Sequence, residues 1–114
     1  MSRLAVCGLV LFAACAANEA APADFDSSAG LAEVVVGGDE FVRYDGERMP
    51  WEEAVVRLRL RTRALADEQR QRFVVHLRAE PQEPGSAAAA RSQQTTNRLM
   101  DQLFVMGVLQ VKFL

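Results

Sequence analysis

The sequence contains little of the two residue types on which many metal sites and all disulfides depend. Its two cysteines, Cys7 and Cys15, fall within the first fifteen of 114 residues, and His76 is the only histidine. A zinc or haem site needs several sulfur or nitrogen ligands held close together, so the residues beyond Cys15 cannot supply one. They cannot form a disulfide among themselves, and a domain built from them must be stabilised by its core. We therefore expect no metal and no cofactor.

The chain also lacks an apolar run long enough to cross a bilayer. The run over residues 4–14 is 11 residues long, whereas a transmembrane helix needs about 20. Arg3 precedes this run, and polar residues follow it from Asn18 onward. A short positive segment, a short apolar segment and then small residues are typical of a secretory signal peptide. The sequence therefore predicts export.

Two cleavage sites fit the end of this signal. Residues 11–15, Leu-Phe-Ala-Ala-Cys, resemble a lipoprotein processing site, although Phe12 departs from the leucine that is commoner there. Ordinary cleavage after a small residue within residues 15–22 would instead leave a protein without a lipid. We expect the first outcome, with Cys15 as the lipid-bearing first residue of a protein held to a membrane in the bacterial periplasm. A soluble periplasmic or secreted protein is the alternative.

A flexible arm and one small domain follow. With residues 1–14 as the signal, residues 15–30 are rich in Ala, Asp and Ser and have almost no apolar periodicity, so we expect a tether. Residues 31–114 are then the domain, near the lower size limit for a single stable core, which dimerisation would help to stabilise. Removing Arg3 from the 13 Lys and Arg leaves 12, against 15 Asp and Glu, a net charge of −3. This mild negative charge disfavours a nucleic-acid partner, because phosphates attract a basic surface.

The first half of the domain predicts a hairpin and a helix. Residues 33–36 and 41–44 have strand composition around a Gly-Gly-Asp turn, and Asp-Gly at 45–46 is a second turn signal. Pro50, followed by two glutamates, is typical of a helix start. Residues 56–61 alternate as a strand would, but a longer apolar stripe in the same region has helical spacing. Its members are Trp51, Ala54, Val55, Leu58, Thr62, Leu65 and Ala66. We therefore expect a helix that ends near residue 68.

The second half predicts a strand, a helix and a final strand. Residues 73–79 place alternate apolar side chains, beginning with Phe73, on one face of a strand. A helix is expected from about residue 87 to Gly107, which suits a left-handed cap, and residues 108–114 alternate again. The order β-β-α-β-α-β with right-handed crossovers places both helices on one face of a mixed sheet. The expected fold is α/β (α+β), a two-layer sandwich whose second sheet face meets solvent or a partner.

Three segments together have a recognisable pattern: the turn and helix start at residues 44–49, the strand at 73–80, and the helix at 99–111 that ends on Gly107 and passes directly into a strand. Over residues 33–114 the chain resembles the periplasmic domain of the ExbD/TolR biopolymer transport family. The resemblance implies ion-driven inner-membrane motors whose periplasmic domains dimerise and contact partner proteins or the cell wall. None of the three segments is a catalytic motif.

The chain departs from that family at its N-terminus. Family members carry one transmembrane helix with an aspartate that takes part in proton conduction, whereas residues 4–14 are too short and contain no carboxylate. No residue of this chain can inherit that role. The resemblance implies that the chain keeps the interaction domain and has a lipid anchor at Cys15 in place of the motor's membrane part.

Candidate catalytic residues are weak in this sequence. His76 stands alone among apolar strand residues, and Glu52 and Glu53 diverge by about 100° because they are adjacent on a helix. Trp51 leads the apolar stripe and is expected in the core. We therefore do not expect an enzyme.

Two functions from different classes remain. The first is a non-enzymatic cell-envelope accessory or interaction protein, which forms a homodimer through its sheet edge or open sheet face and binds envelope proteins or the cell wall. The alternative is a periplasmic binding module for cell-wall or anionic ligands, through Arg57, Arg61 and Arg63 of the first helix. These arginines also fit the solvated face of a helix.

Overall fold

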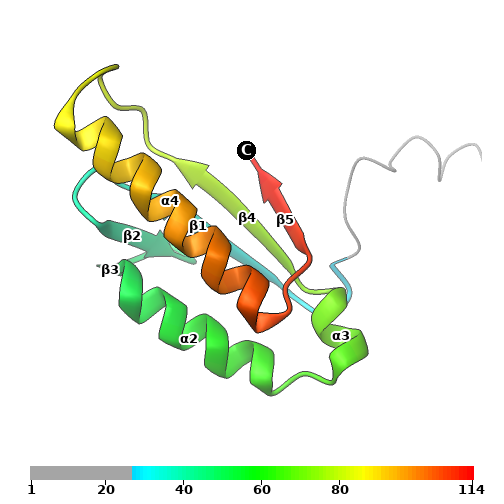
Figure 1. Cartoon of the computed structure of the whole chain (residues 1–114). Helices are drawn as coiled ribbons and strands as arrows, with labels where there is room; N and C mark the ends of the chain where they lie inside the picture. The colour runs from blue at the N-terminus through cyan, green and yellow to red at the C-terminus, as the bar shows by residue number, and fades with distance from the viewer. Residues whose placement is uncertain (1–26) are drawn as a thin grey trace, which may run out of the picture.

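A computed structural model describes residues 27–114, which form a five-stranded mixed sheet with helices packed on one face (Figure 1). In chain order the elements are β1 (Leu31–Val36), β2 (Phe41–Tyr44), β3 (Glu47–Pro50), α2 (Trp51–Arg63), α3 (Asp67–Gln71), β4 (Val74–Ala79), α4 (Ala87–Met106) and β5 (Gln110–Phe113). In space the strand order is β3-β2-β1-β4-β5. The predicted α/β two-layer sandwich is confirmed, and two further elements, β3 and α3, join the predicted order.

The first three strands form an antiparallel meander. β1 pairs with β2, and β2 pairs with β3 through the turn at Asp45 and Gly46, where φ is 49° and 90°. Asp-Gly is favoured in such turns because both central residues take left-handed conformations. The sequence predicts this turn but not β3. The strand forms because β2 offers it a hydrogen-bonding partner and because Met49 fills the core beside Val42, which is a tertiary contact.

Helix α2 starts after Pro50 and ends earlier than the sequence predicts. Pro50 has an extended ψ of 148° and is the N-cap, not the first helical residue. The helix stops at Arg63, and α3 follows as a separate short helix. The guanidinium of Arg70 on α3 donates to the backbone carbonyls of Thr62 (3.1 Å) and Leu65 (2.9 Å). These contacts satisfy carbonyls at the end of α2 and so stabilise the break.

The last three elements form a β-α-β unit whose bounds match the prediction closely. β4 lies parallel to both β1 and β5. The Ser86 Oγ caps α4 by accepting a hydrogen bond from the Ala89 N–H at 3.0 Å. At the other end Gly107 has a φ of 89°. A residue without a Cβ takes this left-handed conformation without strain, so the chain reverses at once into β5.

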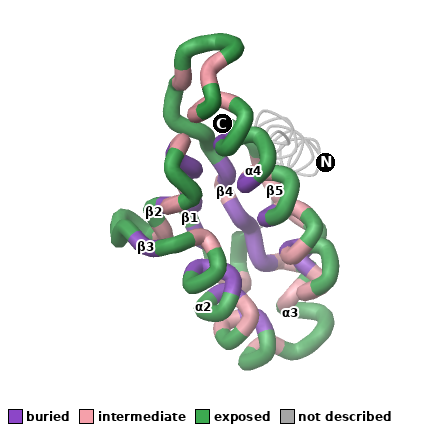
Figure 2. Tube along the Cα trace, turned by 60° about the vertical axis from the view of Figure 1, so that its left-hand side comes forward, coloured by how far each residue is buried: buried purple, intermediate pink, exposed green. Residues whose placement is uncertain are grey.

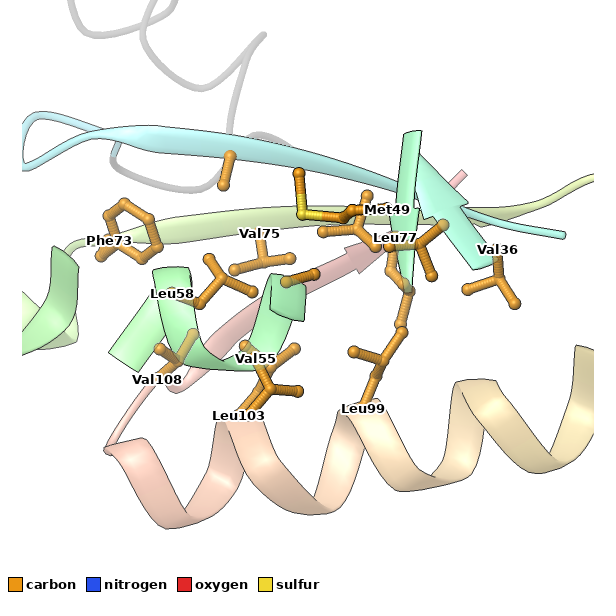
Figure 3. Packing of buried hydrophobic residues seen from close by; sticks show 14 residues of the cluster. Val36, Met49, Val55, Leu58, Phe73, Val75, Leu77, Leu99, Leu103 and Val108 are labelled. Atoms are coloured by element: carbon orange, nitrogen blue, oxygen red, sulfur yellow. The ribbon is translucent and has the colours of Figure 1, made fainter. Parts of the chain in front are cut away.

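The core lies between the sheet and the two long helices. Val75 and Leu77 of β4 meet Leu58 of α2 and Leu99 and Leu103 of α4, and all five are at most 1% exposed (Figure 3). The purple segments in Figure 2 follow this layer, whereas most of the outer surface is green. The apolar stripe predicted for the first helix is confirmed as its buried face from Trp51 to Thr62. Leu65 and Ala66, its last two predicted members, lie beyond the end of the helix, and Ala66 is exposed.

The opposite face of the sheet carries the alternate residues of each strand. We call it the open face. No helix of the described chain covers this face, because α2 and α4 both pack on the other one (Figure 1). Its side chains include Glu33, Val35, Arg43, Arg48, His76 and Arg78.

Candidate interaction surfaces

Strand β5 forms one edge of the sheet, with β4 as its neighbour. The Leu114 N–H donates to the Leu77 carbonyl at 3.0 Å. Alternate residues of a strand bond to the same neighbour, so the backbone groups of Gln110 and Lys112 also face β4, and those of Val111 and Phe113 face outward. This edge therefore offers unpaired N–H and C=O groups to another strand.

Exposed apolar side chains surround this edge. They are Phe104 (75%), Leu109 (62%), Phe113 (60%) and Leu114 (59%). Phe113 lines a shallow groove of about 380 Å³ together with Gln93 and Thr96 of α4. Thr96, Met100 and Phe104 recur every four residues, so they share the flank of α4 that faces β5. We call the outer edge of β5, with Phe104, Leu109, Phe113 and Leu114, the β5 surface.

Strand β3 forms the opposite edge and is polar. Arg48 pairs with Asp39 at 2.6 Å and stacks over the ring of Phe41, with 4.1 Å from Cζ to the ring centroid. The Phe41 N–H donates to the Asp39 carboxylate at 3.1 Å. This bond, together with Arg48, holds the pKa of Asp39 below its ordinary value of 3.8. Pro50 ends the strand and has no N–H to donate.

Arginines form a row across the open face. Val35 on β1 lies opposite Arg43 on β2 and Arg78 on β4, and Arg43 lies opposite Arg48 on β3. Neighbouring strands are about 4.8 Å apart, so this row of Arg48, Arg43 and Arg78 spans four strands. Within residues 27–114, Arg43 and Arg78 form no ion pair with a carboxylate. We call these three residues the arginine row.

The arginines predicted as an anion patch on the first helix are largely occupied. Arg57 pairs with Glu47 (3.2 Å) and Glu53 (2.8 Å). Arg63 has no ion-pair partner in the described part of the chain and lines a cleft of about 230 Å³ that also includes Val105.

Arg61 is the most heavily bonded of the three. Its guanidinium donates to the Tyr44 hydroxyl (3.1 Å) and the Leu31 carbonyl (3.0 Å), pairs with Asp45 (3.3 Å) and lies 4.9 Å from the Phe73 ring centroid. The structure therefore does not bring Arg57, Arg61 and Arg63 together as an unpaired patch.

The residues weighed for catalysis lie apart. His76 is half-buried on the open face, in register with Glu33 and Lys112. Trp51 packs against the core, and its ring lies 5.8 Å from the Arg98 guanidinium. Its buried Nε1 has no hydrogen-bond partner. Within residues 27–114, no three His, Cys, Asp or Glu side chains gather as a metal site requires.

The predicted signal, Cys15 and most of the predicted tether lie outside the described residues. Among the helices that the structure describes, none has the length and apolar character to cross a membrane. No protein-family model matches the chain, and no curated protein matches it at a significant level. The ExbD/TolR resemblance and the lipid on Cys15 therefore stay predictions.

The sequence points to the arginines of the first helix as an anion patch, whereas the arginine row is visible only in the fold. A signal for the row exists, since Arg43 and Arg78 each occupy an alternating position in a predicted strand, opposite the apolar residues. What local patterning cannot show is that they lie beside Val35 in one row. That proximity depends on the parallel register of β1 and β4, which residues 31–36 and 74–79 set only in the folded chain.

Proposed function

We propose that this chain is a non-enzymatic accessory or interaction protein of the bacterial cell envelope. It is exported, held to a membrane through a lipid on Cys15, and acts through an ExbD/TolR-like domain that forms a homodimer and binds envelope proteins or the cell wall. The observation that carries this proposal is the β5 surface. Large apolar side chains gathered beside an unpaired strand edge are typical of protein–protein contact.

Two properties of the β5 surface support a protein partner. Phe104 and Phe113 are 75% and 60% exposed, and burying large apolar side chains on binding is favourable by about 25 cal/mol per Å². The outward N–H and C=O groups of Val111 and Phe113 would be satisfied by a partner strand. A partner would therefore cover apolar side chains and complete backbone hydrogen bonds at the same place.

Export and lipidation are tested on the full chain expressed in a bacterial host. The mature protein should fractionate with membranes, and mass spectrometry should find it beginning at Cys15 with a diacylglyceryl group attached. Cys15→Ser should remove the lipid and release the protein from the membrane fraction. Recovery of an unprocessed chain in the cytoplasm would contradict the proposed location.

The contact surface is tested by light scattering with size-exclusion chromatography of the purified full chain in detergent. Phe113→Asp places a charge on the β5 surface and should convert a dimer to a monomer. Leu60→Asp is the matched control, because Leu60 is 62% exposed on α2, away from β5. A native chain that stays monomeric at high micromolar concentration, or equal effects of both changes, would show that the β5 surface does not mediate dimerisation.

The arginine row favours a second candidate function, the binding of cell-wall or anionic ligands. Arg43 and Arg78 lack carboxylate partners in the described chain, so both guanidinium groups are available to an anion. Sedimentation with peptidoglycan, and separately with anionic vesicles, should be salt-sensitive and should be lost in R43E/R78E. R63E is the control, and loss of binding in R63E instead would favour the helix surface predicted from the sequence.

A further inference from the structure

The edge formed by β5 has the composition of a strand that pairs with itself. We propose that β5 pairs antiparallel with β5 of a second copy, centred on Val111, and joins the two five-stranded sheets into one. This proposal rests on the proposed interaction role of the β5 surface and specifies its partner and its register.

Only certain registers fit the outward-facing groups. In an antiparallel pair, residues whose groups face the partner meet directly and exchange two hydrogen bonds, and the residues between them meet without bonding. In β5 the outward-facing residues are Val111 and Phe113. Leu109 lies just before the strand, and the pairing would have to extend the strand by one residue to add Leu109 to them. A two-fold axis must therefore pass through Leu109, Gln110, Val111, Lys112 or Phe113.

Four of these five centres are unfavourable. An axis through Lys112 places two lysines directly opposite each other, where Cα atoms approach to about 4.5 Å and like charges repel. An axis through Leu109 or Gln110 requires Gly107 to exchange hydrogen bonds with the second copy, although Gly107 is the left-handed cap of α4 and its N–H already bonds to the Phe104 carbonyl at 3.0 Å. An axis through Phe113 leaves only Leu114 beyond it to pair.

The axis through Val111 matches side chains on both faces. Val111 meets Val111 of the second copy, and Leu109 meets Phe113, both of which are about 60% exposed in the single chain. Val111 and Phe113 lie on the helix side of the sheet, because they are in register with the core residues Val75 and Leu77, and this side is next to the flank of α4 that carries Phe104. On the open face Gln110 meets Lys112, a neutral pair in place of two like charges. Apolar groups therefore meet under the helices, and polar groups meet on the open face.

The symmetry also gives α4 a role in the contact. The two-fold axis of an antiparallel strand pair is perpendicular to the sheet, so both α4 helices lie on the same face, one on each side of the axis. In Figure 1 α4 runs over the sheet beside β5, with its last turns near the start of that strand. Phe104 lies in those last turns and would be covered by the approach of the second copy. Specific complexes bury at least ~1,000 Å² of total surface, so a contact made by a four-residue strand of each copy needs the additional surface around Phe104.

Cysteine pairs across the interface test the register on the full chain. Gln110→Cys and Lys112→Cys are made separately and oxidised mildly, each alone and as an equal mixture. In the Val111-centred register, residue 110 of one copy lies about 4.5 Å (Cα–Cα) from residue 112 of the other, and the same residue in two copies is about 8 Å apart. A disulfide tolerates about 4.4–6.8 Å, so only the mixture should cross-link, by at least ~10-fold over either variant alone.

The possible results separate the registers and also separate this inference from the proposed function. Linked peptides are identified by mass, so that bonds through Cys7 or Cys15 are recognised, and the unsubstituted chain gives the background. Cross-linking of K112C alone or of Q110C alone would overturn the Val111 register in favour of another centre. A dimer seen by light scattering without any of these cross-links would overturn the Val111-centred pairing of β5, while leaving the interaction role and the export result in place. Circular dichroism of each variant shows whether it is folded.

Discussion

The two edge strands of the sheet, β3 and β5, differ in how readily another strand could pair with them. Both edge strands are four residues long, but β3 contains Pro50, carries the charges of Glu47 and Arg48, and passes directly into α2. β5 has no proline, Lys112 is its only charged residue, and large apolar side chains surround it. Edges that stay unpaired are often protected by proline and charge. The contrast indicates that the β3 edge resists pairing with another strand and that the β5 edge permits it. We call the β3 edge the closed edge.

The largest expected effect comes from giving β5 the protection that β3 has. Val111→Pro removes an N–H that faces outward, so no hydrogen bond to β4 is lost, but a partner strand loses its central donor. We expect the dimer dissociation constant to rise at least ~100-fold, measured by light scattering across a dilution series. Val111→Thr, which keeps the N–H, should stay dimeric. A V111P chain that remains dimeric would show that the contact does not use the β5 backbone.

Removing the protection of β3 should have the next largest effect. Arg48→Val with Pro50→Val gives this edge an apolar side chain and a second N–H, while it loses the pair with Asp39. We expect this variant to associate as its concentration rises and to have a severalfold lower solubility. Static light scattering measures the association. Arg78→Val is the control, because it removes an arginine from β4, which has neighbours on both sides. Equal loss of solubility in the control would point to net charge as the cause.

A smaller effect, on the free energy of unfolding, is expected at Arg61, whose side chain connects α2 to β1 and to the end of β2. Its guanidinium bonds to Tyr44, Asp45 and the Leu31 carbonyl. Arg61→Ala should lower the free energy of unfolding by about 1–2 kcal/mol, since it removes several partly exposed bonds and an aromatic contact. Arg63→Ala should change it by less than ~0.5 kcal/mol. Urea denaturation measures both, and equal values would contradict the assigned role of Arg61.

The smallest effect is a pH dependence at Asp39, beside the closed edge. Because the Phe41 N–H and Arg48 lower its pKa, the ionised carboxylate stabilises the fold above its unfolded pKa. This contribution is lost as the pH falls through the lowered pKa. Asp39→Asn should therefore be less stable than the native chain at about pH 7, and the difference should shrink at about pH 3. Denaturation curves at both pH values test this, and a constant difference would assign the effect to packing instead of ionisation.

Local signals locate most elements of this fold. The Asp45-Gly46 turn, the left-handed Gly107 and the apolar stripe of α2 each act within a few residues of chain, so the sequence predicts them. The break after Arg63 has a different origin, because Arg70 makes it stable by bonding carbonyls at the end of the preceding helix. The apolar stripe in the sequence continues at helical spacing to Leu65 and Ala66, so local patterning gives no sign that α2 ends at Arg63.

The candidate surfaces were less predictable than the fold. The sequence indicates an edge strand near the C-terminus, but the arginines that it singles out, Arg57 and Arg61, bond to partners up to 30 residues away. The arginine row and the outward direction of Val111 follow from strand register, which depends on long-range pairing. Sequence patterning therefore located elements well and surfaces poorly.

The shared direction of β1 and β5 has a geometric consequence for an anchored protein. Both strands run parallel to β4, so the chain reaches β1 at the same end of the sheet at which β5 begins. In a dimer joined through β5, the two starts of β1 lie at opposite ends of the combined sheet. Lipids on both chains that enter one bilayer then favour a two-fold axis along the membrane normal. The sheet would lie flat over the lipid, and either the helices or the arginine row would face the headgroups.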